Sequence, residues 1–156
     1  MPGLLNKEVI IISNINLKNY ILNGKYDEAK EICDSMSMED IKNEIIQITY
    51  QTESLSVYAF SEYMSSFKDC IEWNKLIIEI LINPLCFIEG AYSIAFHYSK
   101  QLLKKEYSID NMERLLFFYD IPERLLEKEK ALDIAKSIIQ IDSMNTIAKK
   151  VLKEHT

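Results

Sequence analysis

A six-residue pattern, G-x-Y-x-x-A, occurs twice in this chain and constrains its fold more than any other feature. The two copies are residues 24–29 and 90–95, and residues 130–135 keep the alanine without the glycine and the tyrosine. Ala29 and Ala131 lie 102 residues apart, which is three times 34. Thirty-four residues is the length of a known helix–turn–helix repeat unit. The pattern therefore predicts stacked pairs of helices that are presented to a partner.

Glycine and proline are scarce, with three of each in 156 residues. An all-β domain needs a turn about every 8–12 residues, which so few turn-forming residues do not supply. Hydrophobic residues make up 48 % of the chain and charged residues 27 %, the ordinary balance of a globular protein. We therefore expect an all-α fold, organised as one helical domain over residues 1–156.

Apolar residues recur at helical spacing between several breaks in the chain. Ser37 is placed to cap a helix, and Asn83-Pro84 marks a firm boundary between two others. We expect residues 85–106 to form one long central helix, with Gly90 inside it or marking a break in it. About nine antiparallel helices are predicted, at residues 7–23, 26–36, 38 to a break at 52–54, 55–64, 67–82, 85–106, 109–119, 128–141 and 146–153.

The glycine, tyrosine and alanine of residues 24–29 match the turn between the two helices of a tetratricopeptide repeat. Residues 130–145 match the end of such a repeat. The chain thus resembles the tetratricopeptide repeat family, most closely over residues 10–36 and 125–152. The resemblance implies a degenerate α-solenoid in which Ala29 allows two helices to approach closely. An irregular helical bundle is the alternative.

The net charge of −6 is unevenly distributed, because residues 101–156 carry ten basic and ten acidic groups and the whole excess lies before them. An acidic surface repels phosphate backbones and anionic membrane surfaces, and it attracts basic proteins. We therefore expect a basic protein partner, with no binding to nucleic acid or membrane. Acidity that serves only solubility remains the alternative.

Asp27, Glu31 and Asp34 share one face of the predicted helix at residues 26–36 and form the first candidate partner-binding patch. Acidic residues in the first turn of a helix also suit its dipole, so a solvated face would explain part of the pattern.

Glu89, Ser93 and His97 stand at positions i, i+4 and i+8 of the predicted long helix, and form the second candidate partner-binding site. The row allows three interpretations: a solvent-facing stripe, the lining of a polar groove that touches a partner, or a catalytic set. Side chains stacked along one helix leave no room for a substrate with an oxyanion donor opposite, so we set catalysis aside.

No motif for a nucleophile, a phosphate-binding loop or a dinucleotide is present, and the three cysteines do not have zinc-binding spacing. We expect no enzymatic activity, no cofactor and no metal. The cysteines are predicted to be small buried residues in a reducing compartment. With no apparent signal peptide and no long apolar stretch, we expect the protein in the cytoplasm.

These features favour an interaction protein, and within that class a bacterial immunity or antitoxin-type inhibitor of a basic toxin domain. The bacterial assignment rests on 24 Ile against 3 Val and 16 Lys against 2 Arg, which is typical of an AT-rich genome. The alternatives are a generic helical-repeat scaffold or adaptor, and an enzyme or small-ligand binder with a pocket near Glu89 and His97. The sequence leaves the partner's identity and the oligomeric state open.

Overall fold

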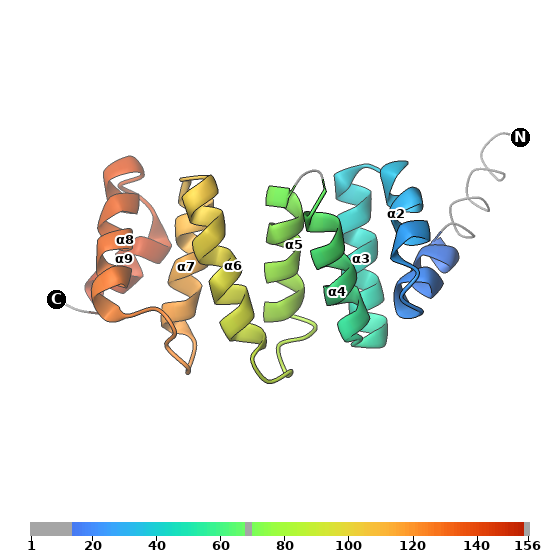
Figure 1. Ribbon diagram of the computed structural model, residues 1–156. Coiled ribbons are helices and arrows are strands. Elements are labelled where there is room, and N and C mark those ends of the chain that lie inside the picture. Colours follow the sequence, from blue (N-terminus) through green and yellow to red (C-terminus); the bar gives the residue numbers. More distant parts are fainter. Residues whose placement is uncertain (1–13, 68–69, 155–156) are drawn as a thin grey trace, which may run out of the picture. The chain divides into compact units, whose positions relative to one another are not determined.

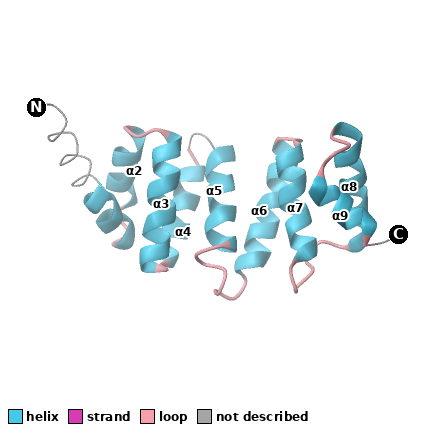
Figure 2. Cartoon of the chain, turned by 180° about the vertical axis from the view of Figure 1, so that it is seen from behind, coloured by secondary structure: helices cyan, strands magenta, loops and turns pink. Residues whose placement is uncertain are grey.

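The computed structural model describes residues 14–67 and 70–154, and 76 % of these residues are helical, with no strand among them (Figures 1 and 2). The all-α fold and the expected number of helices are thereby confirmed. The helices are α2 (Tyr26–Asp34), α3 (Met38–Thr52), α4 (Leu55–Ser65), α5 (Cys70–Ile82), α6 (Ala91–Lys105), α7 (Ile109–Asp120), α8 (Lys128–Ile141) and α9 (Thr146–Lys153), and residues 14–22 are helical ahead of α2.

Most predicted helix bounds agree with the structure to within one or two residues. The predicted N-cap of α3 is confirmed, because the Ser37 hydroxyl accepts a hydrogen bond of 3.1 Å from the backbone N–H of Asp40. The N-cap satisfies one of the backbone donors that a helix start leaves free. The predicted first helix begins at residues that lie outside those described.

The prediction of one long helix over residues 85–106 is wrong. Residues 83–90 form turns, and α6 begins only at Ala91. The backbone N–H of Leu85 donates to the carbonyl of Ile80 at 2.9 Å, which closes the end of α5. Gly90 then adopts a φ of 84°, a left-handed value that a right-handed helix does not contain. Gly90 therefore marks a break, which was one of the two roles expected for it.

The chain divides into two compact units, Met1–Glu89 (unit 1) and Gly90–Thr156 (unit 2). Unit 1 contains 14 acidic and 7 basic residues, whereas unit 2 contains 10 acidic and 11 basic residues. The acidic excess therefore belongs to unit 1 alone. That the whole chain behaves as a single domain stays a prediction.

Unit 1 arranges its helices in two layers, because α2 contacts α4 and α3 contacts α5, while α4 packs against both α3 and α5. Phe60 of α4 is fully buried at the centre of an aromatic cluster. Its ring centroid lies 5.6 Å from that of Tyr26 and 5.9 Å from that of Trp73, which it meets edge-on. The cluster joins α2, α4 and α5 into one core.

Unit 2 is organised around α7, which contacts α6, α8 and α9. Phe118 of α7 is fully buried, and its ring centroid lies 5.2 Å from that of Phe96 on α6. Its neighbour Phe117 packs against Tyr92, the tyrosine of the second G-x-Y-x-x-A copy. The core of unit 2 is thus centred on the α6–α7 pair, and α8 and α9 complete it.

The alanines of the repeated pattern are fully buried, as the close approach of two helices requires. Ala29 and Ala95 each expose 0 % of their surface, and so does Ala131. Each pattern glycine lies just before a helix and itself adopts a positive φ, which is 71° at Gly24 and 84° at Gly90. In both copies the glycine thus lies at the start of a helix and the alanine is buried in its first two turns.

We expect Ala29→Leu to lower the free energy of unfolding by about 1–3 kcal/mol, because three extra carbons enter a space that is already filled. The urea midpoint of the variant measures this loss. Glu28→Leu is the matched control, since Glu28 is exposed and a surface change of this kind is close to neutral. Equal midpoints for Ala29→Leu and the control would contradict close packing at Ala29.

Candidate partner-binding surfaces

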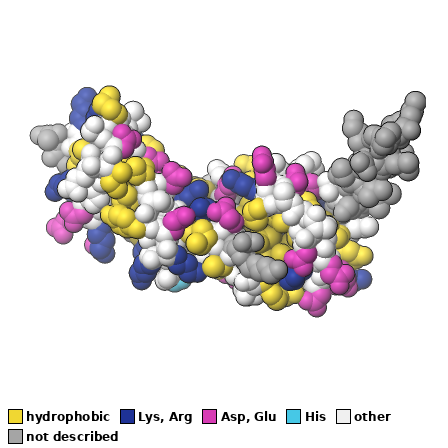
Figure 3. Space-filling model, turned by 90° about the horizontal axis from the view of Figure 1, so that it is seen from above, with side chains coloured by type: hydrophobic (Ala, Val, Ile, Leu, Met, Phe, Trp, Pro, Cys, Tyr) yellow, Lys and Arg dark blue, Asp and Glu magenta, His cyan; other side chains and the backbone are white. Residues whose placement is uncertain are grey.

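A pocket of about 520 Å³ opens in unit 1 where α2 ends and α3 begins. Residues 35–37 form the turn that connects α2 to α3, and the residues on either side of Ser37, Met36 and Met38, both line the pocket. Figure 3 looks onto this end of the helices and shows hydrophobic side chains among acidic ones over unit 1. Most of the residues that line the pocket are apolar, and they come from α2 to α5 and from the turns that follow α2 and α4: Cys33, Met36, Met38, Ile41, Met64, Phe67 and Trp73.

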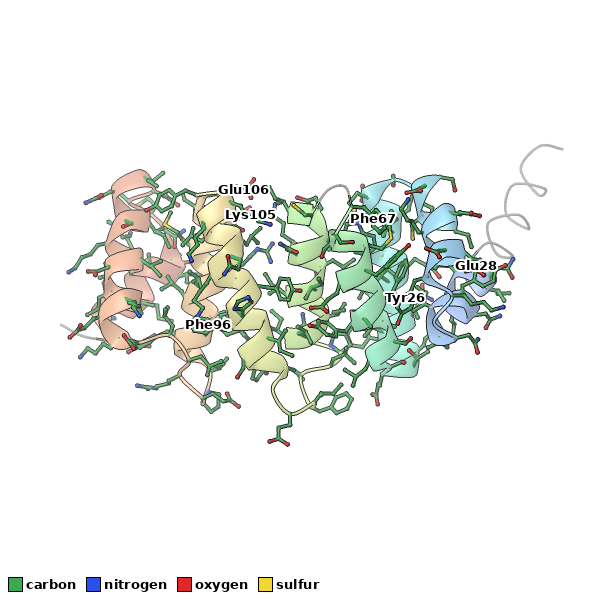
Figure 4. All side chains as sticks on the ribbon, viewed as in Figure 1. Tyr26, Glu28, Phe67, Phe96, Lys105 and Glu106 are labelled. Atoms are coloured by element: carbon green, nitrogen blue, oxygen red, sulfur yellow. The ribbon has the colours of Figure 1, made fainter. Side chains whose placement is uncertain are left out.

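Three of the lining residues are methionines, and methionine adapts to partners of different shape because its side chain is flexible and polarisable. Phe67, which Figure 4 places beyond the upper end of α4, leaves 52 % of its surface exposed. Trp73 at the base of the pocket is buried. The pocket therefore offers an adaptable apolar surface to a large side chain from another molecule.

Lys30 and Asp34 of α2 form the polar edge of this pocket. The Lys30 ammonium is paired with the Asp34 carboxylate, and lies 5.1 Å from the centroid of the Phe67 ring. Burial, followed by the charge of Asp34, raises the pKa of the Cys33 thiol to about 12. The thiol is therefore neutral near pH 7, and Cys33 contributes apolar surface rather than a nucleophile.

The predicted acidic patch lies beside the pocket. Asp27, Glu31 and Asp34 are all exposed on α2, and Asp34 lines the pocket itself. Asp27 accepts a hydrogen bond from the Tyr63 hydroxyl, and the Tyr63 ring meets the Phe67 ring edge-on with centroids 5.0 Å apart. A chain of contacts thus connects the acidic face of α2 with the exposed aromatic edge of the pocket.

The hydrogen bond to Asp27, then partial burial and the nearby carboxylates, raises the pKa of Tyr63 above the ordinary tyrosine value. Since the folded-state pKa is the higher one, this bond stabilises the fold below about pH 10 and is lost as the pH rises through the folded pKa. We expect Asp27→Asn to lower the Tyr63 pKa. The ionisation of Tyr63 is isolated by subtracting the absorbance titration of a Tyr63→Phe variant from that of the same protein with Tyr63 present. This difference is measured once with Asp27 in place and once in the Asp27→Asn variant. An equal Tyr63 pKa in the two would contradict the contact.

The second predicted site requires a correction. Glu89 precedes the left-handed Gly90 and therefore does not lie on α6, so Glu89, Ser93 and His97 do not form one row along a helix. Ser93 and His97 are exposed on α6, and Glu89 is exposed at the end of unit 1. The predicted groove role of Glu89 stays a prediction.

His97 lines a groove in unit 2 of about 530 Å³. Lys100 and Lys104 of α6 lie along it, together with the exposed ring of Tyr107 and the side chain of Leu115 from α7. Lys100 and Lys104 follow His97 by three and seven residues, so all three lie on the same side of α6. Tyr107 and Leu115 were missed, because only the packing of α7 against α6 brings them to this surface.

A neighbouring groove of about 480 Å³ shares Lys100 and Leu115 with the first and continues toward α8. It adds the apolar side chains of Leu125 and Leu126 and the charged side chain of Lys130. The two grooves therefore adjoin, and we call them together the α6–α8 groove.

Within residues 14–67 and 70–154, no three His, Cys, Asp or Glu side chains are grouped so that they could hold a metal ion. Among the same residues, no helix combines the length and the apolar character that crossing a membrane requires. Comparison of the chain with protein-family models, with curated proteins and with solved structures gave no match. Any functional assignment therefore rests on the chain's own surfaces.

Proposed function

We propose that this protein is a helical interaction module whose unit 1 binds a basic protein. One observation carries the proposal: an apolar pocket lined by methionines and aromatic rings opens beside the exposed acidic face of α2. The partner's basic residues would face Asp27, Glu31 and Asp34, and an apolar side chain would enter the pocket. Charge complementarity then accelerates association, and the buried apolar contact slows dissociation.

We propose further that the helices form degenerate tetratricopeptide-like repeats. The buried alanines and the left-handed glycines of the two pattern copies support this reading. It is also supported by α3, which contacts both α4 and α5, and by α7, which contacts both α8 and α9. Repeats of this kind present their helices as a binding surface. The proposal agrees with a scaffold and with an inhibitor alike.

Within this class we favour a bacterial immunity or antitoxin-type inhibitor that acts in the cytoplasm. A nuclease toxin must attract phosphate and is therefore basic, which suits a unit with 14 acidic and 7 basic residues. Burial holds the Cys33 thiol of the unit 1 pocket in its neutral form, so we assign this thiol no nucleophilic role in the proposed function. A generic adaptor would bind its partner without blocking an activity.

The test uses the full-length tagged chain, purified from the cells that encode it, with bound proteins identified by mass spectrometry. The captured protein is then purified and its binding kinetics are measured. We expect a basic partner, and charge reversal of Asp27, Glu31 and Asp34 to Lys should slow its association on the order of tenfold. Co-expression should relieve the partner's toxicity if the chain is an inhibitor and should leave growth unaffected if it is an adaptor.

The control reverses Glu123, Glu129 and Glu154 to Lys, three exposed acids of unit 2 with the same total charge change. A further variant, Phe67→Ala, removes an exposed ring from the pocket and should speed dissociation more than it slows association. An acidic partner, or equal effects of the two charge reversals, would contradict the proposed surface.

A further inference from the structure

The α6–α8 groove of unit 2 differs in charge from the surface of unit 1. His97, Lys100 and Lys104 follow one another along α6, and Lys130 joins them from α8. Glu127 and Asp133 line the α8 side of the groove, and Glu127 is paired with Lys130 at 3.3 Å. The basic side chains are thus concentrated on the α6 side, and the acidic ones lie at the α8 side.

The cations on α6 are available to a partner. Among the described residues, no ion pair involves Lys100 or Lys104. The Lys100 ammonium lies 4.5 Å from the centroid of the Phe96 ring, and this contact holds it at the groove without neutralising its charge. Figure 4 shows Phe96 projecting from α6. Lys104 also suits the negative end of the helix dipole, which explains its place but does not explain the apolar surface beside it.

The apolar part of the groove lies between the basic and the acidic side chains. Leu115 belongs to both pockets but exposes only 4 % of its surface, whereas the half-buried Leu103 and Leu125 present apolar surface, one in each pocket. Tyr107 exposes 68 % of its surface at the same place. Such a surface fits a row of aliphatic side chains, so a partner that fills it must carry both leucine-like groups and negative charge.

We propose that the α6–α8 groove binds an acidic amphipathic segment of a protein. Its aliphatic side chains pack on the half-buried Leu103 and Leu125, and its carboxylates face Lys100 and Lys104 on α6. A helix with apolar residues at i, i+3, i+4 and i+7 presents these two kinds of group on adjacent faces. This surface is separate from the one proposed for a basic partner, since it lies wholly in unit 2.

Charge and chemistry favour a protein over a nucleic acid. Glu127 and Asp133 would repel a phosphate backbone that followed the groove, and the chain as a whole carries a net charge of −6. Single-stranded nucleic acids also need several exposed aromatic rings for stacking. The rings among the residues that line the groove are those of Phe96, His97 and Tyr107, and the Phe96 ring is half-buried against Phe118 and lies next to the Lys100 ammonium.

The test measures the fluorescence anisotropy of a labelled synthetic peptide of Glu and Leu, with leucines at helical spacing, against the full-length protein. We expect binding that weakens as salt rises. Lys100→Glu combined with Lys104→Glu should weaken it on the order of tenfold or more. Lys136→Glu combined with Lys149→Glu, which reverses two exposed lysines elsewhere in unit 2, should leave the affinity nearly unchanged. Tyr107→Ser should weaken binding without changing its salt dependence.

Three outcomes would overturn the proposal. The first is equal affinity of the groove variant and the control variant for the acidic peptide. The second is equal binding of a peptide in which every Glu is replaced by Lys. The third is that a single-stranded oligouridine binds more tightly than the acidic peptide and that the Lys100→Glu, Lys104→Glu variant no longer binds it. This outcome would make the groove a nucleic-acid site. Circular dichroism of each variant verifies that the helices are intact.

Discussion

Replacing Phe60 with alanine is expected to lower the free energy of unfolding by about 3–5 kcal/mol. Phe60 is fully buried, and its ring touches those of Tyr26, Tyr63 and Trp73. The substitution removes the ring from the point where three helices meet and leaves a cavity there. The surrounding rings cannot close this cavity fully, because each is held by its own helix.

Urea unfolding followed by fluorescence measures this effect locally, because Trp73 is the only tryptophan of the chain and packs against Phe60. Phe87→Ala is the control, since it also removes a phenyl ring of unit 1 but from a position that is 63 % exposed. The control should change stability by no more than about 0.5 kcal/mol. If both variants lost the same stability, the aromatic cluster would not be the centre of the unit 1 core.

Replacing Phe118 with alanine should cause a loss of the same size in unit 2, about 3–5 kcal/mol. Phe118 is fully buried, and its ring centroid lies 5.2 Å from those of Phe96 and Phe117. Far-ultraviolet circular dichroism during urea unfolding records the change. Tyr107→Ala serves as the exposed control in the same unit, and a comparable loss from both substitutions would contradict the described core.

The Phe118 variant also tests the predicted single domain. Under that prediction the urea midpoint of the Phe118→Ala variant shifts equally whether it is measured by Trp73 fluorescence or by circular dichroism, because one cooperative transition includes the whole chain. If the midpoint measured by fluorescence stayed unchanged while the midpoint measured by circular dichroism fell, the two units would unfold separately.

Local signals explain which helices were predictable. The bounds of α8 and α9 match the sequence expectation because they depend on nearby residues: periodic apolar positions and, for α9, the Asn145 side chain that accepts a hydrogen bond of 3.0 Å from Ala148. The break before α6 was not settled by pattern alone. Residues 85–96 are apolar enough for a helix, and a glycine is compatible with either a helix interior or a left-handed turn.

The candidate surfaces likewise contain one part that local sequence signals predicted and another that they did not. The helical period by itself placed Asp27, Glu31 and Asp34 on one exposed face, since residues three and four apart lie on the same side of a helix. The pocket beside them could not be predicted from the sequence, because Met36 lies in the turn between α2 and α3 whereas Met64 lies on α4.

Which residues of different helices meet depends on the register in which those helices pack, and that register follows from the fit of all the core side chains at once. Leu115 lies in α7 and reaches the His97 groove only through this packing. The sequence by itself therefore determined the fold class, most helix bounds and the acidic face, whereas the tertiary structure alone decided the apolar pocket and the basic groove.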